Sequence, residues 1–290
     1  MVYTTNEYCR DVFGKKLYKI SLNAGMTCPN RDGKLDSRGC IFCSEGGSGD
    51  FAASAEKNIS AQIEEAKKRI EKKFKGNEYI AYFQAFTNTY APVEFLRSLY
   101  FPVVKREDIA VLSIATRPDC LGEEVLELIQ KLNAIKPVWI ELGLQTIHQK
   151  TIDYIRRGYA TDQYDLAVKE LKKIGVHVIT HVILGLPGEN VSDMCETVKH
   201  VAEVRSDGIK LQLLHVLKGT DLEKEYLSGS FKTLSMEEYI EILKECMKYI
   251  PEEMVIHRIT GDGPKKTLLA PLWSADKKRV LNAIHKALEF

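Results

Sequence analysis

Residues 176–184 read VHVITHVIL, and His177 and His181 interrupt an otherwise apolar, largely β-branched segment. Side chains alternate along a β-strand, so residues two apart share a face. One face of this predicted strand therefore carries both histidines, while the other carries Val178, Val182 and Leu184. A strand of a parallel sheet that is covered on both faces is expected to be apolar on both. The histidines therefore indicate a sheet with one polar face.

The same alternation recurs in the strands predicted at 79–84, 137–143 and 208–214. Polar or small residues on one face of these segments are Tyr82, Gln84, Trp139, Glu141, Gly143, Gln145, Lys210 and Gln212. Scattered polar residues that are satisfied inside a closed core are the alternative explanation. Because the pattern returns in several strands, it favours a polar lumen enclosed by the sheet.

Strands and helices alternate along most of the chain. Further strands are predicted at 15–23 and 109–115, and helices at 60–74, 92–104, 122–135, 147–157, 162–174 and 190–205. Such alternation predicts a parallel sheet with right-handed crossovers. We therefore expect an α/β fold, a (β/α)6 partial TIM-type barrel over residues 1–234. Residues 235–290 are expected to form a short helical extension packed on the barrel, with helices at 235–250 and 274–288 and a further strand at 254–260.

Composition excludes several classes of protein. The 290 residues are 44% hydrophobic and carry a formal net charge of +1, which does not indicate a protein that wraps a polyanion. No stretch approaches the roughly 20 apolar residues of a membrane span, and no signal segment is visible. Seven cysteines without such a signal argue against a disulfide framework. We expect a cytoplasmic protein with no membrane partner.

Three cysteines cluster in the loop that follows the first predicted strand. Cys28, Cys40 and Cys43 have the spacing C-x11-C-x2-C, and the glycine-rich segment 44–50, which follows, is either a linker or a cover for the site. A structural zinc site usually has four ligands in two close pairs, and this loop has only one such pair. The spacing therefore does not favour zinc, although zinc stays an alternative. Three thiolates also suit an iron–sulfur cluster with one open coordination position.

Strand ends place other polar residues beside this loop, because the active sites of βα barrels lie at the carboxyl ends of the strands. The residues predicted at this end are Gln84 with Thr87 and Asn88, Thr116 with Arg117, Gln145, His181, and Gln212 with His215. We expect the cysteine loop and these side chains to surround a single site.

Several stretches together resemble the radical S-adenosylmethionine (SAM) superfamily, over roughly residues 15–260. They are 28–33 (CPNRDG), 40–49 (CIFCSEGGSG), 82–90 (YFQAFTNTY), 116–119 (TRPD), 141–146 (ELGLQT) and 185–189 (GLPGE). The chain is most similar to a subfamily related to the Elongator catalytic subunit and to coproporphyrinogen dehydrogenase. Most of the superfamily has the spacing C-x3-C-x2-C, from which this chain departs.

The resemblance implies two cofactors and assigns residues to them. Cys28, Cys40 and Cys43 would hold a [4Fe–4S] cluster, whose open iron binds SAM and delivers the electron that yields a 5′-deoxyadenosyl radical. By the same resemblance, Gln84 lies near the methionine amine, Gln145 and His181 near the ribose, and Arg157 near the methionine carboxylate. Thr116 is assigned to the cofactor as a strand-end residue.

The same residues have simpler interpretations. Arg157 is also interpretable as a solvated cation at a helix end beside Gly158. His177 and His181, four residues apart, are interpretable as paired metal ligands or as satisfied core histidines.

The substrate is inferred only from the Elongator-like resemblance, which implies radical modification of a tRNA wobble uridine. Lys210, Gln212 and His215 are the predicted catalytic residues, because they lie on and just after the last barrel strand. The resemblance also implies an electron donor such as flavodoxin or ferredoxin. A radical enzyme acting on a small metabolite or peptide, and a non-catalytic zinc or electron-transfer protein, are the alternatives.

Overall fold

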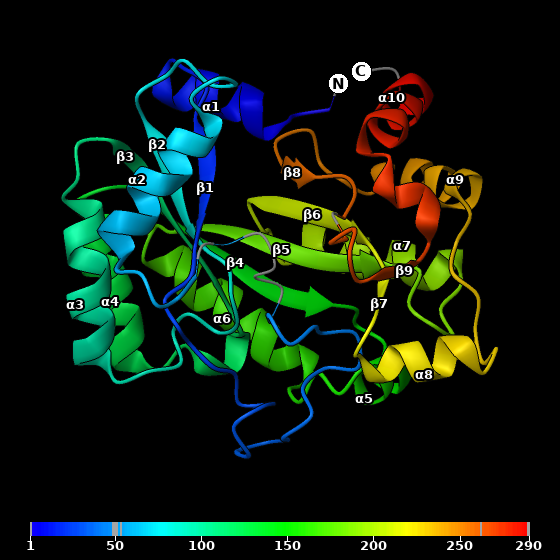
Figure 1. Cartoon of the computed structure of the whole chain (residues 1–290). Coiled ribbons are helices and arrows are strands. Elements are labelled where there is room, and N and C mark those ends of the chain that lie inside the picture. Colours follow the sequence, from blue (N-terminus) through cyan, green and yellow to red (C-terminus); the bar gives the residue numbers. More distant parts are fainter. Residues whose placement is uncertain (1, 48–51, 53, 262, 289–290) are drawn as a thin grey trace.

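Seven parallel strands form the central sheet of the computed structural model, which describes residues 2–47, 52, 54–261 and 263–288. Neighbouring strands in the sheet follow the order β1-β2-β3-β4-β5-β6-β8. Their bounds are β1 Tyr18–Leu22, β2 Tyr79–Phe83, β3 Ile109–Thr116, β4 Val138–Gln145, β5 His177–Leu184, β6 Gly208–Leu213 and β8 Val255–Arg258. The sheet curls around a lumen, which confirms the predicted partial barrel (Figure 1).

Helices between successive strands pack on the convex face of this sheet (Figure 1). They are α2 Ile59–Ile70, α3 Val93–Val104, α4 Glu123–Asn133, α6 Thr161–Lys173 and α7 Val191–Glu203, with a 3-10 turn at Pro118–Cys120 after β3. The short helix α5 (Gln149–Tyr154) lies elsewhere, and its Tyr154 packs on a separate cluster that contains Ile41 of the cysteine loop. No helix in the described part of the chain is long and apolar enough to cross a bilayer.

The two faces of the sheet differ as predicted. The outer face contributes Phe83, Ile140, Leu142, Val178 and Leu211 to the main apolar core beneath the helices, and each of them is fully buried. The alternate residues of the same strands point into the lumen, where Tyr82, Glu141, His181 and Lys210 line a cavity.

The base of the lumen is apolar, which corrects the expectation that the interior is polar throughout. Leu17, Ile80, Val111, Trp139 and Ile179 form a separate buried cluster where the strands begin. His177 lies at this level, with its ring 5.3 Å from the ring of Trp139, and its Nε2 is 3.4 Å from Nε2 of His257. His177 and His181 therefore occupy different layers and do not form the metal pair considered above.

Helix α1 (Thr5–Phe13) closes this base and is absent from the sequence-based prediction. Its Tyr8 ring packs against Trp139 and His177. A capping box starts the helix: the backbone N–H of Thr4 donates to the carboxylate of Glu7 over 2.7 Å, and the Thr4 hydroxyl accepts from the Glu7 N–H. The spacing Thr4-x-x-Glu7 is visible in the sequence, so this helix was predictable.

The C-terminal residues belong partly to the sheet itself. The predicted strand near 254–260 is β8, which pairs with β6 and gives the barrel seven strands where six were predicted. Outside the sheet lie α8 Asp221–Leu227, α9 Met236–Met247, a 3-10 turn at Leu272–Ala275, α10 Lys277–Leu288 and the antiparallel pair of β7 Val216–Leu217 with β9 Leu268–Ala270. Tyr239 of α9 connects these parts, because its buried hydroxyl donates to the carbonyl of Ile259 over 3.0 Å.

We predict that Tyr239→Phe lowers the free energy of unfolding by about 1 kcal/mol, because it removes one buried hydrogen bond without changing the packed volume. Tyr249→Phe is the matched control, since the Tyr249 side chain is 43% exposed, and it should change stability by less than about 0.5 kcal/mol. Urea unfolding followed by circular dichroism measures both variants. Equal stability of the two would show that the Tyr239 hydroxyl does not tie α9 to the sheet.

Candidate functional site

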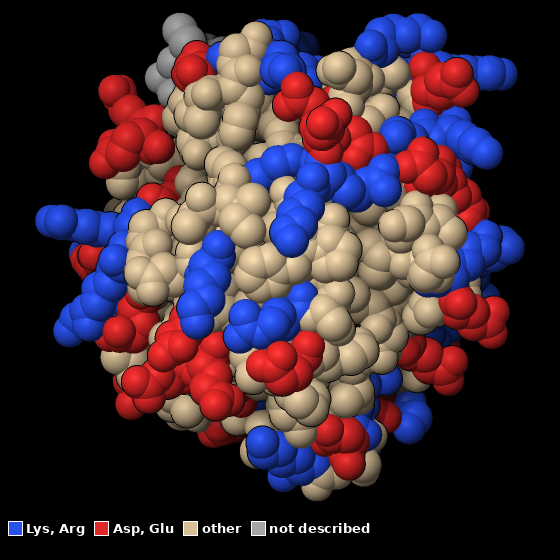
Figure 2. Space-filling model, turned by 90° about the vertical axis from the view of Figure 1, so that its left-hand side faces the viewer, with Lys and Arg blue, Asp and Glu red and all other residues tan. Residues whose placement is uncertain are grey.

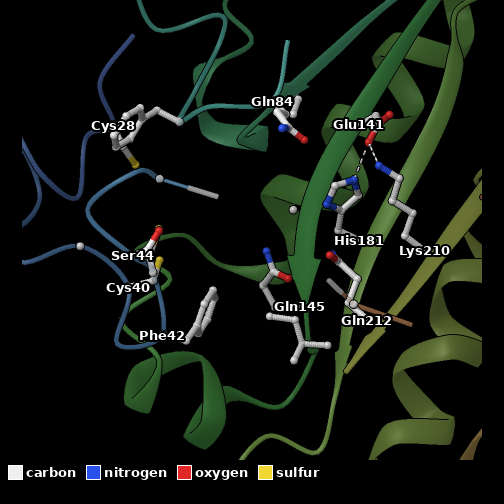
Figure 3. A pocket seen from close by; sticks show the side chains of 18 of the residues that line it. Cys28, Cys40, Phe42, Ser44, Gln84, Glu141, Gln145, His181, Lys210 and Gln212 are labelled. Carbon is white, nitrogen blue, oxygen red and sulfur yellow. Dashed lines mark hydrogen bonds and ion pairs between the residues drawn. The ribbon is translucent and has the colours of Figure 1, made fainter. Parts of the chain in front are cut away.

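A cavity of about 450 Å³ opens at the carboxyl ends of the barrel strands. This volume lies in the range of small-molecule and cofactor sites. Cys28, Cys40, Phe42 and Ser44 line one wall, and the strand-end residues line the opposite wall (Figure 3). Of the predicted site residues, the three cysteines, Gln84, Thr116, Gln145, Arg157, His181, Lys210, Gln212 and His215 all border this cavity.

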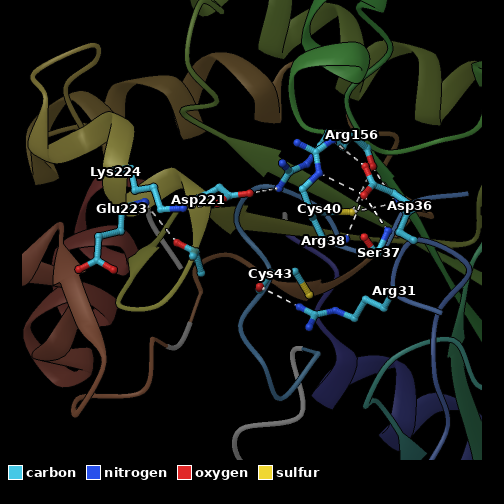
Figure 4. A network of polar contacts seen from close by, with 12 residues as sticks. Arg31, Asp36, Ser37, Arg38, Cys40, Cys43, Arg156, Asp221, Glu223 and Lys224 are labelled. Atoms are coloured by element: carbon cyan, nitrogen blue, oxygen red, sulfur yellow. Dashed lines mark hydrogen bonds and ion pairs between the residues drawn. The ribbon is translucent and has the colours of Figure 1, made fainter. Parts of the chain in front are cut away.

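The cysteine loop is fixed to the barrel by backbone contacts around Ile41. The Ile41 N–H donates to the carbonyl of Ile155 over 3.2 Å, and the Ile41 carbonyl accepts from the N–H of Leu222 over 3.0 Å. Arg31 closes the loop, since its Nη2 donates to the carbonyls of Cys43 and Ser44 over 2.9 and 2.5 Å (Figure 4). Of the glycine-rich segment predicted to be a linker or cover, Gly47 borders the cavity, and residues 48–50 lie outside the described residues.

The three cysteines fit an iron–sulfur cluster better than zinc. Sulfurs that bind one zinc ion at about 2.3 Å lie within about 4.6 Å of one another. Within the described residues, the group of three metal-ligating atoms that lie within 4.8 Å of one another is His148, Asp193 and Glu196, which are not the cysteines. Burial, and next the charge of Cys43, raise the pKa of the Cys40 thiol to about 12, so the thiolate form needs a cationic centre beside it.

A charged layer crosses the lumen and lines the inner part of the cavity, and Glu141 is its centre. The Glu141 carboxylate accepts from Lys19 Nζ over 2.7 Å, from Ser113 Oγ over 2.8 Å and from His181 Nε2 over 2.7 Å, and it also contacts Lys210 Nζ. Burial alone would raise the pKa of Glu141, but Lys19 and Lys210, with the His181 hydrogen bond, hold it well below its usual value.

His181 is a neutral member of this layer. Burial, and next the charge of Lys210, lower the pKa of His181 to about 4. Its Nε2–H therefore donates to Glu141 at neutral pH. The resemblance placed His181 near the ribose of SAM, and its position on the cavity wall agrees with that assignment.

Two side-chain amides that border the cavity each have one buried atom without a hydrogen-bond partner. These atoms are Nε2 of Gln84 and Oε1 of Gln145 (Figure 3). Buried polar atoms are nearly always paired, so an unpaired donor and an unpaired acceptor facing one cavity indicate a polar ligand. Gln145 has a φ of 69° beside a register shift between β4 and β5. Its Nε2 lies 2.8 Å from where a Cβ on Gly143 would stand, so the side chain folds back over this glycine.

Backbone and hydroxyl groups hold the guanidinium of Arg157, which the resemblance assigned to the methionine carboxylate. Its Nη1 donates to the carbonyls of Leu144 and Thr146 over 2.7 and 2.6 Å, and its Nε donates to the carbonyl of Tyr159 over 3.1 Å. The Nη2 donates to the Thr161 hydroxyl over 3.2 Å. These bonds fix the guanidinium between the end of β4 and the start of α6 on the border of the cavity, and its contact with the methionine carboxylate stays a prediction.

Thr116 and the predicted catalytic residues lie at different depths along the cavity. The Thr116 hydroxyl is 2.6 Å from the Thr89 hydroxyl. Lys210 belongs to the charged layer around Glu141, while Gln212 lies nearer the cavity mouth (Figure 3). His215 lies on the rim, with Nε2 3.0 Å from Ser274 Oγ.

Sequence reasoning left four residues that organise the site without a specific role. Glu141 was placed on the polar face of its strand, Arg117 was placed at the strand ends beside Thr116, and Lys19 and Asn30 were not assigned to the site. Lys19 shares the two-residue period of β1, which was a usable signal. Asn30 and Arg117 carry no such period, and their contacts with the cysteines appear only in the folded chain.

Comparisons with known proteins agree with this geometry. A model described as the radical SAM superfamily matches residues 36–201, and one described as the radical SAM C-terminal domain matches residues 206–289. Cys40 and Cys43 lie inside the first match and Cys28 lies before it, in keeping with the long first spacing. The predicted resemblance is confirmed.

Relatives and a solved structure extend the comparison. The uncharacterised protein YtqA of Bacillus subtilis is 45% identical over 287 residues, which is 99% of this chain and 89% of that protein. The tRNA uridine(34) acetyltransferase of Methanocaldococcus jannaschii is 30% identical over 161 residues, 54% of this chain and 29% of that protein. The archaeal Elp3 of Methanocaldococcus infernus, 20% identical, shares the fold with a TM-score of 0.68 over 94% of this chain and 63% of that chain.

We predict that alanine at Cys28, Cys40 or Cys43 removes bound iron and abolishes the formation of 5′-deoxyadenosine from SAM, because each change removes one of three cluster ligands. Iron and sulfide content and chromatography of the nucleoside products measure this after anaerobic reconstitution. Cys120→Ala is the control, since the Cys120 thiol borders a different cavity with Leu35 and Tyr90. Full iron content and turnover in any of the three variants would contradict the ligand assignment.

Proposed function

The chain belongs to the radical SAM superfamily, and from this we propose that it modifies the side chain of the wobble uridine of a tRNA by radical chemistry. Membership makes it a radical SAM enzyme with a [4Fe–4S] cluster and SAM as cofactors. When bound, these cofactors supply an electron and a sulfonium whose cleavage gives methionine and a 5′-deoxyadenosyl radical, which takes hydrogen from unactivated carbon.

The protein's own residues hold and enclose these groups. Cys28, Cys40 and Cys43 supply the cluster ligands from one wall of the cavity. Gln84 offers an unpaired N–H donor, and Gln145 an unpaired oxygen acceptor, from the opposite wall. These polar groups orient SAM between the cluster and the strand ends.

The lower lumen shields the reactive centre. The Glu141 layer fills the barrel with paired charges, and the apolar cluster around Trp139 closes it underneath. These layers fill the lower barrel, so a substrate would enter by the mouth. Gln212 and His215, which lie on that side, are the groups we assign to the substrate.

A tRNA substrate is supported chiefly by one relative. The Methanocaldococcus jannaschii protein, whose name specifies uridine 34 of tRNA, shares 30% identity over 161 residues with this chain. The match covers 29% of that protein, so the shared portion, and not its acetyltransferase activity as a whole, supports the proposal.

Charge near the mouth also supports an RNA substrate. Lys218, Lys265 and Lys266 are exposed on the segments that join or flank β7 and β9, and Leu217, Gly263 and Pro264 of the same segments border the cavity. The Lys218 N–H donates to the Thr267 carbonyl over 2.8 Å, which holds the two segments together. Lysines there are placed to contact the phosphates of a nucleotide that enters the site.

The face formed by α2, α3 and α4 does not resemble an RNA-binding surface, because basic and acidic side chains are mixed on it (Figure 2). Lys67 pairs there with Glu64 and Asp108, and Arg106 pairs with the same two carboxylates. The basic run at 67–69 is therefore an ion-paired surface, and we assign RNA contact to the mouth. We further propose a cytoplasmic enzyme reduced by an external one-electron donor such as flavodoxin or ferredoxin.

Mass spectrometry of tRNA nucleosides tests the proposed substrate. In cells that lack the gene, we expect one modified wobble uridine to disappear and its precursor to accumulate. A plasmid encoding the native chain or Cys120→Ala should restore the nucleoside, whereas Cys40→Ala should not. Unchanged tRNA nucleosides, with SAM cleavage intact in the purified enzyme, would refute the tRNA substrate and direct the search to small metabolites or peptides.

A further inference from the structure

Two buried side chains donate toward the sulfurs of the cluster ligands. Asn30 is 1% exposed, and its Nδ2 lies 3.4 Å from Cys40 Sγ. The same Nδ2 lies 2.6 Å from the carbonyl of Arg156 and 3.2 Å from the carbonyl of Arg157. Two carbonyl oxygens repel an amide oxygen and attract an amide N–H, so these contacts fix the orientation of the amide with its N–H groups toward the sulfur.

Arg117 approaches a second ligand from the end of β3. It is 8% exposed, and its Nη1 lies 3.9 Å from Cys28 Sγ and 3.0 Å from the carbonyl of Arg157. Asp119 holds the guanidinium on its other edge, with Nε and Nη2 donating over 2.9 and 2.8 Å. The guanidinium carbon also lies 4.8 Å from the ring centre of Tyr159, so its position is fixed on three sides.

Both side chains also donate to backbone carbonyls of the turn formed by residues 156–158. Arg156 and Gly158 have φ values of 56° and 80°, which turn the carbonyl groups of this segment toward the cysteine loop. A Cβ at position 158 would lie 2.8 Å from Oδ1 of Asn30, so the close approach requires glycine. The Arg156 side chain pairs with Asp221 over 2.8 Å and anchors the turn to α8 (Figure 4). The Arg157 guanidinium ties the turn to the end of β4.

N–H groups that point at thiolate sulfurs withdraw electron density from the metal centre. Hydrogen bonds to cluster sulfurs are one of the factors that set the reduction potential of an iron–sulfur cluster. The reduced cluster carries one more negative charge, so a nearby N–H or guanidinium stabilises it relative to the oxidised form. Both effects move the potential in the positive direction and ease reduction by an external donor.

We propose that Asn30 and Arg117 are positioning residues that orient Cys40 and Cys28 and raise the reduction potential of the cluster. The proposal rests on the cluster that family membership implies, and it does not depend on the identity of the substrate. It assigns the turn at 156–158 to the same task, as the support that holds both donors in place.

A redox titration followed by electron paramagnetic resonance tests the proposal in the anaerobically reconstituted full chain. We expect Asn30→Ala and Arg117→Gln to move the midpoint potential to more negative values than in the native chain. Lys34→Ala is the control for charge, since Lys34 is exposed on the same loop and its Nζ lies over the ring of Tyr90, 5.3 Å from the ring centre. It should leave the potential unchanged. Native potentials in both Asn30→Ala and Arg117→Gln, at full iron content, would overturn the proposal.

If the variants fail to assemble a cluster, a second measurement on the native protein tests the same proposal. Protein labelled with ¹⁵N-asparagine, reduced without SAM, should show a ¹⁵N hyperfine coupling in pulsed electron paramagnetic resonance, because Asn30 Nδ2 lies 3.4 Å from a ligand sulfur. Label on arginine should give a weaker coupling from Arg117, at 3.9 Å. Absence of any ¹⁵N-asparagine coupling would equally overturn the role of Asn30.

Discussion

The buried carboxylate of Glu141 is the interaction on which the barrel interior depends. It stands on β4 and contacts Lys19 of β1, Ser113 of β3, His181 of β5 and Lys210 of β6. A buried charge is costly unless it is paired and hydrogen-bonded, and loss of one partner of such a pair typically costs about 3–5 kcal/mol. The curled sheet satisfies this requirement only when these strands face one another across the lumen. The network therefore selects the curvature of the sheet and separates an apolar base from a reactive mouth.

The mouth of the cavity lies above this network and is formed by segments that are far apart in the sequence. The cysteine loop forms one wall, the strand ends form the other, and the turn at 156–158 joins them through Asn30 and Arg117. The unpaired amide atoms of Gln84 and Gln145 face the space between the walls. The segments that join and flank β7 and β9 border the same cavity and carry the exposed lysines that we propose for substrate contact.

The sequence was most informative where structure is periodic. A period of two residues identified the polar face of β2, β4, β5 and β6, and the position of Cys28–Cys43 after the first strand located the site. Helices α1 and α8 were missed although Thr4-x-x-Glu7 and Thr220-x-x-Glu223 mark their starts. The hydrogen-bond partners of Arg157 were not predicted, because local sequence does not reveal which backbone carbonyls a guanidinium will meet. The partners of Glu141 and the pairing of β7 with β9 depend on contacts across the lumen and between distant segments, which no local pattern encodes.

Transfer of deuterium tests most directly the proposal that a radical formed in this cavity acts on a tRNA uridine side chain. Substrate tRNA would be isolated from cells that lack the gene and are grown in deuterated medium, then incubated with the reconstituted enzyme, SAM and a reductant. We expect 5′-deoxyadenosine that is heavier by one mass unit, formed in proportion to the modified uridine. Unlabelled 5′-deoxyadenosine from active enzyme in the presence of this tRNA would contradict it.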